Sequence, residues 1–294
     1  MSTNFLTPRA NIDVGDAVIV YQSRTSVQAI KIERGQHVQT RFGYFPHNDM
    51  IGQPYGTKMV SRTKKKGWIY LLYPTPELWT QALPHRTQIL YTADISLIVF
   101  MLDVRPGSIV IESGTGSGSL SHSIARTLAP TGHLHTFEFH PERCESAKLE
   151  FEAHGFSPEC ISIECRDVCR DGFGLANVAD AVFLDLPRPH EAIASARVAL
   201  KTIGSKIASF SPCIEQVQLT CAELRKNGFV EIETVECLWR TFEVKDVELE
   251  KAPIGTEKEE TCSITTATPH TTQHGHTGYI TFASLYPYVV VAPP

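Results

Sequence analysis

The sequence has no run of about 18 apolar residues, the length that a helix needs to cross a bilayer, so no membrane-spanning helix is expected. Its first eight residues, Met1 to Pro8, lack a basic start and an apolar core, so a secretory signal is not expected either. The eight cysteines are scattered, and no two have the C-x-x-C spacing of zinc and dithiol sites. We therefore expect no metal site, and reduced thiols in the nucleus or cytoplasm.

An excess of positive charge is also lacking, since the formal net charge is −5. The average conceals a division, however. Residues 1–66 contain ten Lys and Arg against four Asp and Glu, whereas residues 67–294 have a net charge of −11. Lys58, Arg62 and Lys64 to Lys66 form a cluster dense enough to contact phosphate groups. A solvated hairpin tip would have the same composition, so both interpretations stay open.

Two domains are indicated by the order of the patterns. Short β-type runs separated by turns fill residues 1–75 and predict a small antiparallel β domain. Strand and helix patterns then alternate through residues 76–294, which is typical of a parallel sheet. Residues 243–276 are polar, and we expect a flexible insertion there. A last strand over 278–283 is expected to run antiparallel to its neighbour.

A glycine-rich turn is the most informative motif. Ile109 to Ser113 forms an apolar run followed by Gly114, Gly116 and Gly118, and a helical segment begins at Leu120. Strand, glycine turn and helix in this order predict a Rossmann-like sheet that exposes its backbone to a nucleoside cofactor. Glycines allow a sharp turn and a close approach by the ligand.

The spacing of the glycines bears on the choice of cofactor. A dinucleotide turn needs a small third residue where Ser119 stands, and here the third glycine comes one residue early. The negative charge of Glu112 suits the positive methionine part of S-adenosylmethionine better than a pyrophosphate. The motif therefore favours S-adenosylmethionine over NAD or FAD, with a purely structural turn as the remaining interpretation.

Three further acidic residues end successive predicted strands. Glu138 lies 24 residues after Gly114, at the spacing of a carboxylate that binds a ribose. Asp167 is placed to reach the adenine amino group, and Asp185 follows a fourth buried strand. Each alone would be explained as a turn or a helix cap. Their common position at the carboxyl edge of one sheet predicts a ligand site.

With these motifs assembled, the chain resembles the catalytic subunits of the eukaryotic tRNA (adenine(58)-N(1))-methyltransferase family. The similarity runs from about Gly15 to Ala283, through the segments 84–91, 112–118, 138–140, 167–168, 185–187, 209–218 and 275–279. The resemblance implies a Rossmann-like class I methyltransferase domain with a mostly parallel seven-stranded sheet. It implies methyl transfer to N1 of adenine 58 in the tRNA T-loop, in the nucleus. The implied partner is a related non-catalytic subunit in a heterotetramer with two copies of each.

The resemblance also implies site residues. The cofactor would be framed by Leu90, Glu112, Ser113, Gly114, Thr115, Gly116, Ser117, Gly118, Glu138, Arg143, Asp167, Val168 and Asp185. Asp185 matches the catalytic aspartate of the family, and Tyr91 is our candidate for an aromatic wall beside an extruded base. The candidates for contact with tRNA are Arg41, His47, Lys58, Arg86, Gln88, Ser211, Pro212 and Thr277.

Two other functions stay open at this stage. The same core serves methyltransferases with protein or small-molecule acceptors, which have no need of a basic β domain. A non-catalytic tRNA-binding subunit is the second alternative, but such subunits have degenerate cofactor loops. The intact glycine turn and Asp185 favour an enzyme.

Overall fold

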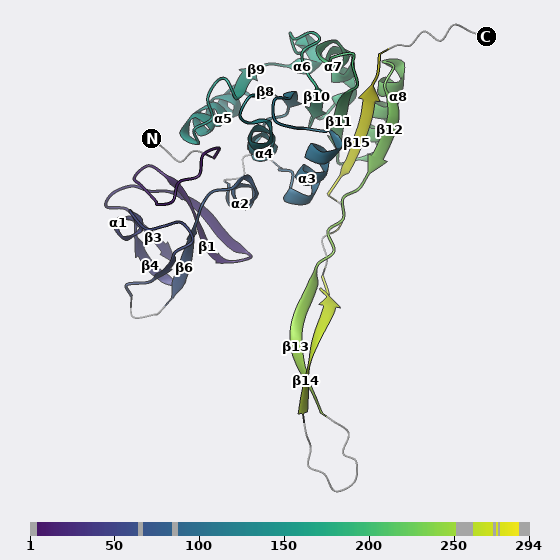
Figure 1. The fold of residues 1–294 in the computed structure, drawn as a ribbon. Helices are drawn as coiled ribbons and strands as arrows, with labels where there is room; N and C mark the ends of the chain where they lie inside the picture. The colour runs from purple at the N-terminus through teal and green to yellow at the C-terminus, as the bar shows by residue number, and fades with distance from the viewer. Residues whose placement is uncertain are drawn as a thin grey trace, which may run out of the picture.

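The computed structural model describes residues 5–63, 67–83, 88–250, 261–272, 275 and 277–287. They form two separate sheet systems and a long hairpin (Figure 1). No helix in these ranges is long and apolar enough to cross a membrane. The N-terminal part and the larger domain meet at α2, Pro76–Ala82. This helix contacts strand β2, Ser26–Lys31, of the first and helix α4, Ser119–Leu128, of the second.

The N-terminal part is the antiparallel β domain that the sequence predicts. Four strands pair in the order β2-β1-β6-β5, beside a hairpin of β3 and β4. Val18 and Val20 of β1 belong to the same core as Leu71 of β6, and Ile19 between them is fully buried as well, so both faces of β1 are covered at this point. The elements are β1 Ala17–Ser23, β2 Ser26–Lys31, β3 His37–Thr40, β4 Gly43–Pro46, α1 His47–Met50, β5 Lys58–Val60 and β6 Trp68–Leu72.

The larger domain has a seven-stranded sheet in the order β12-β15-β11-β10-β7-β8-β9. The neighbours from β11 to β9 pair in parallel, whereas β15 is antiparallel to both β11 and β12. This confirms the predicted mostly parallel sheet with an antiparallel last strand. The strands are β7 Ile109–Ser113, β8 His133–Glu138, β9 Ile161–Cys165, β10 Ala181–Leu184, β11 Ser205–Ser211, β12 Val230–Val235 and β15 Tyr279–Leu285.

Helices cover both faces of this sheet, which is why its strands read as continuous apolar runs. Along β7, Val110 packs with the core of α3, α4 and α5, whereas Ile111 packs with the core of α6, α7 and α8. The helices are α3 Thr92–Met101, α4 Ser119–Leu128, α5 Pro141–Ala153, α6 Val168–Asp171, α7 Ile193–Ala199 and α8 Ile214–Lys226, with a short 3-10 helix over Pro189–Ala192.

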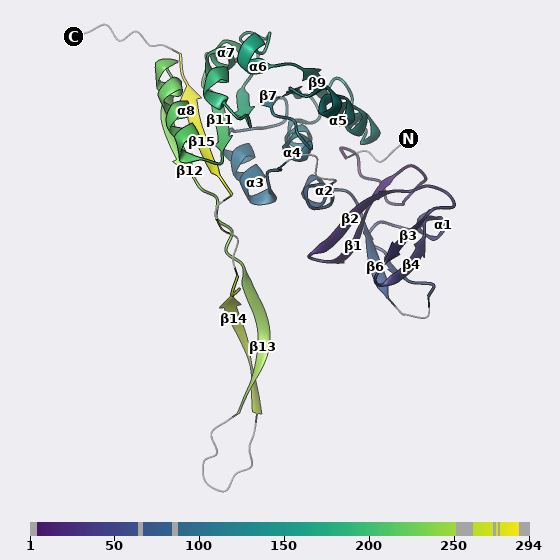
Figure 2. The same cartoon turned by 180° about the vertical axis from the view of Figure 1, so that it is seen from behind.

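Residues 242–269 differ from the expected flexible insertion. β13, Phe242–Glu250, and β14, Thr261–Pro269, pair antiparallel over their whole length. The ribbon projects far from the larger domain in both views (Figures 1 and 2). Polar composition indicated an excursion from the sheet, but the β-branched residues of both strands favour an extended pair. β12 ends at Val235, where the chain leaves the sheet.

Candidate functional site

The glycine turn lies against the end of a neighbouring strand. Directly after β7, Gly114 has a φ of +96°. A Cβ on Gly114 would lie 2.1 Å from the carbonyl oxygen of Asp185, so only glycine fits. The N–H of Asp185 in turn donates to the carbonyl of Ser113 at 2.9 Å. Two features that the sequence shows 71 residues apart therefore meet at one point of the carboxyl edge.

Glu112 is buried beneath this turn. Its Oε2 accepts hydrogen bonds from Ser121 Oγ at 2.6 Å and Thr136 Oγ1 at 2.7 Å. Burial raises the pKa of Glu112 to about 7, and the negative charges of Asp185 and Glu138 add to the effect. The sequence predicts that this charge faces the cofactor. The structure instead places the carboxylate among protein hydroxyls, where it supports the turn from within the sheet.

Glu138 ends β8 beside the turn. Its Oε2 accepts from the N–H of Gly116 at 3.0 Å, and its Oε1 accepts from the N–H of His140 and from Arg143 Nη2 at 2.8 Å. Burial alone would raise the pKa of Glu138, but these hydrogen bonds and the charge of Arg143 hold it below its usual value. The carboxylate is therefore ionised, and it fixes the middle of the turn.

A hollow of about 440 Å³ opens next to Glu138, between the ends of β8 and β9. Asp167 lies on its wall and also caps α6, because its Oδ1 accepts from the N–H groups of Cys169 and Arg170. The simple capping role and the ligand-facing position thus coexist. Val168 is buried behind it. The lining residues are Phe139, Glu164, Cys165, Arg166, Asp167, Arg170 and Asp171.

Asp185 has a different environment from Glu138. It is half-buried, and within the described ranges no hydrogen-bond donor reaches its carboxylate. Burial raises the pKa of Asp185 to about 7, and the charge of Glu138 contributes. A carboxyl group that is poised near neutrality and open to a new donor can orient a ligand amino group.

Comparison with known proteins agrees with this geometry. The family model of the tRNA methyltransferase complex GCD14 subunit matches residues 67–268, and a TrmI-like N-terminal model matches residues 11–58. This chain belongs to the GCD14 family. The resemblance seen in the sequence is confirmed.

Two relatives of this GCD14 family member are named as catalytic subunits of tRNA (adenine(58)-N(1))-methyltransferase. The Cryptococcus neoformans protein is 48% identical and covers 80% of this chain, but only 54% of its own length is matched. The Dictyostelium discoideum protein is 40% identical, with 96% of this chain and 99% of the relative covered. The chain thus spans about half of the first relative and nearly all of the second.

A solved structure supports the fold over the same length. A crystal structure of an S-adenosylmethionine-dependent O-methyltransferase from Thermotoga maritima matches with a TM-score of 0.79 at 27% identity. The match covers 95% of this chain and 96% of the other. The N-terminal β domain and the larger domain are therefore both parts of a known arrangement.

Tyr91 and Leu90 precede α3 at the same edge. Tyr91 is the N-cap residue of α3 and is 46% exposed, so it is open to a ligand and is not a packed core tyrosine. Leu90 is buried, and its carbonyl accepts from Ser119 Oγ at 3.1 Å. This bond ties the segment before α3 to the first turn of α4, directly after the glycine turn.

Asp94 is a residue that the sequence patterns did not single out. It is buried in the first turn of α3, and its carboxylate accepts from the N–H of Tyr91 and from the hydroxyl of Thr277. Burial raises the pKa of Asp94. Among the residues that the structure describes, its Oδ1 has no hydrogen-bond partner. An acidic residue three positions after a helix cap was the only available signal, and it is typical of ordinary helices.

The candidates for tRNA contact divide by exposure. Arg41 and Lys58 are exposed on the β domain, where they lie over the rings of Phe42 and Trp68 respectively. Gln88, Pro212 and Thr277 are exposed at the carboxyl edge of the larger domain.

Other candidates are not open to a ligand in this structure. His47 is buried, and its Nδ1 accepts the N–H of Glu33 at 3.1 Å, so it holds two segments of the β domain together. Burial lowers the pKa of His47, which disfavours a cation there. Ser211 is buried as well. Neither His47 nor Ser211 is therefore exposed for the contact with tRNA that the sequence predicted. Arg86 and the lysines at 64–66 lie outside the described residues.

Proposed function

We propose that this chain transfers a methyl group from S-adenosylmethionine to N1 of adenine 58 in the T-loop of tRNA. Family membership and the names of the relatives support the reaction class and the substrate. The observation that carries the proposal is the packing of Gly114 under Asp185, because it places a bare turn beside an open carboxyl group. A donor site and an acceptor site then share one edge of the sheet.

The residues at this edge fit the proposed cofactor. Gly114 lets the turn pack directly against the backbone of Asp185, and Glu138 is ionised and placed to accept ribose hydroxyls. The hollow beside Phe139 and Asp167 would hold the adenine. When bound, S-adenosylmethionine supplies a methyl group that its sulfonium makes electrophilic.

The protein's part in the reaction is alignment and charge stabilisation. N1 of adenine has a lone pair and no proton at neutral pH, so no base is needed to generate the nucleophile. As the methyl group transfers, the purine becomes cationic and its amino group becomes a better donor. The Asp185 carboxylate would accept that amino group and bind more strongly as charge develops. Exposed Tyr91 would stack on the extruded base.

The charge division suits a large polyanionic substrate. Residues 1–66 have a net charge of +6, and Arg41 and Lys58 are exposed there. Phosphates of tRNA would contact this domain while the target base enters the site of the larger domain.

The hairpin of β13 and β14 supports the proposal of a partner subunit. Val244, Leu249 and Ile264 are exposed on it, with at least 45% of each accessible. A two-stranded ribbon is at best marginally stable in water. A second protein that covers it would bury this apolar surface. We propose that the partner is a related non-catalytic subunit, in a nuclear heterotetramer with two copies of each.

Mass mapping of modified nucleosides tests the function. Unmodified tRNA is incubated with S-adenosylmethionine and the chain, with and without the partner. We expect 1-methyladenosine at position 58. Methyl transfer to a protein acceptor, or to another tRNA position, would contradict the proposal. Size-exclusion chromatography with light scattering tests the assembly, and deletion of 242–269 should abolish it.

A further inference from the structure

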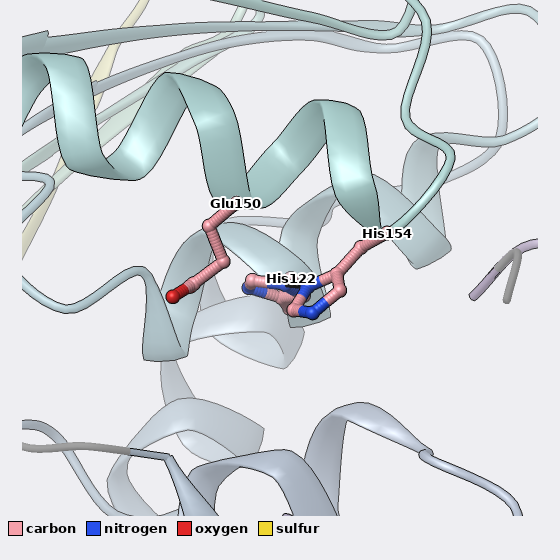
Figure 3. Close-up of side chains that lie close together, drawn as sticks. All are labelled: His122, Glu150 and His154. Atoms are coloured by element: carbon pink, nitrogen blue, oxygen red, sulfur yellow. Dashed lines mark hydrogen bonds between the residues drawn. The ribbon is translucent and has the colours of Figure 1, made fainter. Parts of the chain in front are cut away.

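Two buried histidines lie behind the glycine turn and connect to it. His122 is in α4, and His154 caps the end of α5. His122 Nδ1 is 2.6 Å from the carbonyl oxygen of Gly118, and His122 Nε2 is 2.8 Å from His154 Nδ1. Figure 3 shows His122 between Glu150 and His154. The two histidines therefore form a series of hydrogen bonds that ends at Gly118, the last glycine of the turn.

The positions of the protons follow from the acceptors when both rings are neutral. A backbone carbonyl only accepts, so His122 Nδ1 must carry a hydrogen and donate to Gly118. The other nitrogen of the same ring then has a lone pair. His154 Nδ1 must therefore be the donor of the 2.8 Å bond. In this neutral state each ring is held in one tautomer. His154 donates to His122, and His122 donates to Gly118.

Gly118 is the point where the turn becomes helix α4. Its φ is +74°, and its N–H donates to the carbonyl of Thr115 at 2.8 Å. Its carbonyl accepts both the backbone N–H of His122 at 3.2 Å and the side chain of the same residue. The imidazole thus sets the direction of this peptide group. The preceding turn from Gly114 depends on that direction.

Aromatic side chains hold the two histidines in place. The Phe5 and Trp79 rings lie 4.6 and 4.5 Å from the His154 ring, and the Phe156 ring lies 5.2 Å from that of His122. The N–H of Phe5 also donates to the carbonyl of His154 at 3.1 Å. Hydrogen bonds in such an apolar setting are stronger than in water. The series of contacts thereby extends from Phe5 in the N-terminal segment to the glycine turn.

A metal ion is the competing explanation for this cluster. His122, His154 and Glu150 offer ligand atoms within 4.8 Å of one another. Two nitrogens on one tetrahedral zinc, with bonds of about 2.0 Å, lie about 3.3 Å apart. The observed 2.8 Å between the rings is a hydrogen-bond distance. The geometry therefore favours a hydrogen bond between the two rings over a metal ion.

We infer that His122 and His154 are positioning residues that hold Gly118, and with it the glycine turn, in the conformation that binds the cofactor. This inference rests on the proposed function. Neither histidine touches the reacting atoms. Their effect is on cofactor affinity, while contacts to tRNA stay unchanged.

Substitution of His122 tests the inference, with S-adenosylhomocysteine as the titrated probe in isothermal titration calorimetry. His122→Asn keeps a donor near the Nδ1 position, whereas His122→Gln places its amide near Nε2 and His122→Phe keeps only the ring. We expect His122→Gln and His122→Phe to weaken binding about tenfold or more, the effect of one lost buried hydrogen bond. His122→Asn should stay within about threefold of the wild type, and the KM for tRNA should not change.

A second histidine pair supplies the control. The rings of His133 and His135 in β8 lie 4.2 Å apart, and both residues have Ser162 as a hydrogen-bond partner, away from Gly118. His135→Phe should leave the affinity for S-adenosylhomocysteine unchanged. A loss of affinity in the His122 variants but not in His135→Phe would show that the effect is specific to His122.

The outcomes distinguish the failures. If the wild-type chain binds no S-adenosylhomocysteine, the proposed function fails. If the wild type binds and His122→Gln binds equally well, the positioning role is overturned. Should His122→Phe not fold, the comparison of Asn with Gln still decides. Stoichiometric zinc that is lost on substitution of either histidine would also overturn the inference, in favour of a metal site.

Discussion

Two parts of the sheet edge differ in how far the protein itself satisfies their polar groups: the part proposed to bind the cofactor (the cofactor side) and the part proposed to hold the adenine (the acceptor side). At the ends of β7 and β8, Glu112 and Glu138 accept hydrogen bonds from protein donors. At the end of β10 and the start of α3, the Asp185 carboxylate and Asp94 Oδ1 have no donor within the described residues. On the first side the protein's own donors fix the carboxylates, whereas on the second side the Asp185 carboxylate has acceptor capacity left for a ligand.

This difference appears in the ionisation of the carboxyl groups. The pKa of Glu138 is lowered by its hydrogen bonds, whereas burial raises the pKa of Asp185 to about 7. A fixed charge suits a cofactor that binds in one geometry. A group that gains its partner only with the substrate can respond to charge that develops in the reaction.

Asp185→Ala should give the largest effect, because it removes the open carboxylate and leaves the cofactor side intact. We expect the methylation rate to fall on the order of 10²- to 10³-fold, as for loss of one preorganised electrostatic contact. Affinity for S-adenosylmethionine should stay within a few-fold. Single-turnover assays and calorimetry measure the two. A retained rate with lost cofactor binding would show that the two sides are not separate.

Gly114→Ala tests the cofactor side, because it should disturb the glycine turn. The added Cβ would need to displace the carbonyl of Asp185, and the φ of +96° would be strained. We expect a loss of about 3 kcal/mol in unfolding free energy together with loss of cofactor binding. Gly35→Ala is the matched control, because its φ is +78° but no atom lies within 4 Å of its Cβ. Equal effects of the two substitutions would contradict the close approach.

Glu112 lies beneath both sides, and its raised pKa predicts a pH dependence of stability. A carboxyl group with a pKa of about 7 when folded and 4.5 when unfolded binds more protons in the folded state. Its contribution is complete below pH 4.5 and is lost as pH rises through 7. Glu112→Gln should remove up to roughly 3 kcal/mol of this decline. Urea unfolding at pH 5 and pH 8 measures it, and an unchanged difference would exclude the cause.

The smallest effect is expected on the basic β domain. Lys58→Gln should weaken tRNA binding a few-fold at low salt, and it should reduce the slope of log affinity against log salt by about one. Filter binding between 50 and 200 mM salt, concentrations at which such effects are typically seen, measures both. Lys226→Gln is the control, because this lysine is paired with Glu223 on α8. A similar loss in both variants would indicate a general charge effect.

Much of the cofactor side could be predicted because it is local in sequence. Ile109 to Gly118 contains strand, turn and helix start in one segment, and φ values above zero at its three glycines bear out the turn. The apolar patterns also predicted that Glu138, Asp167 and Asp185 lie close to strand ends. Glu138 ends β8, Asp185 directly follows β10, and Asp167 lies two residues after the end of β9, as the cap of α6. The length of β12 could not be predicted from its own residues, because its pairing ends where its partner β15 begins at Tyr279.

Contacts between distant segments were not predictable in this way. His47 is a residue type that often contacts phosphate, but it is buried by packing within the β domain. The role of Asp94 depends on its hydrogen bond with Thr277, and that of His122 on its hydrogen bond with Gly118. His154 depends on its contact with the Phe5 ring. The sequence patterns indicate none of these contacts. The β13 and β14 ribbon follows from pairing across a segment whose composition is merely polar.

By itself, the sequence determined the order of strands and helices, the glycine turn and the family, because each depends on neighbours within a few residues or on motif identity. Only the tertiary structure decided which acidic groups are charged, which histidines are buried and which side of the edge stays open. These properties depend on burial and on donors from other strands. Such donors lie close in space and far apart along the chain.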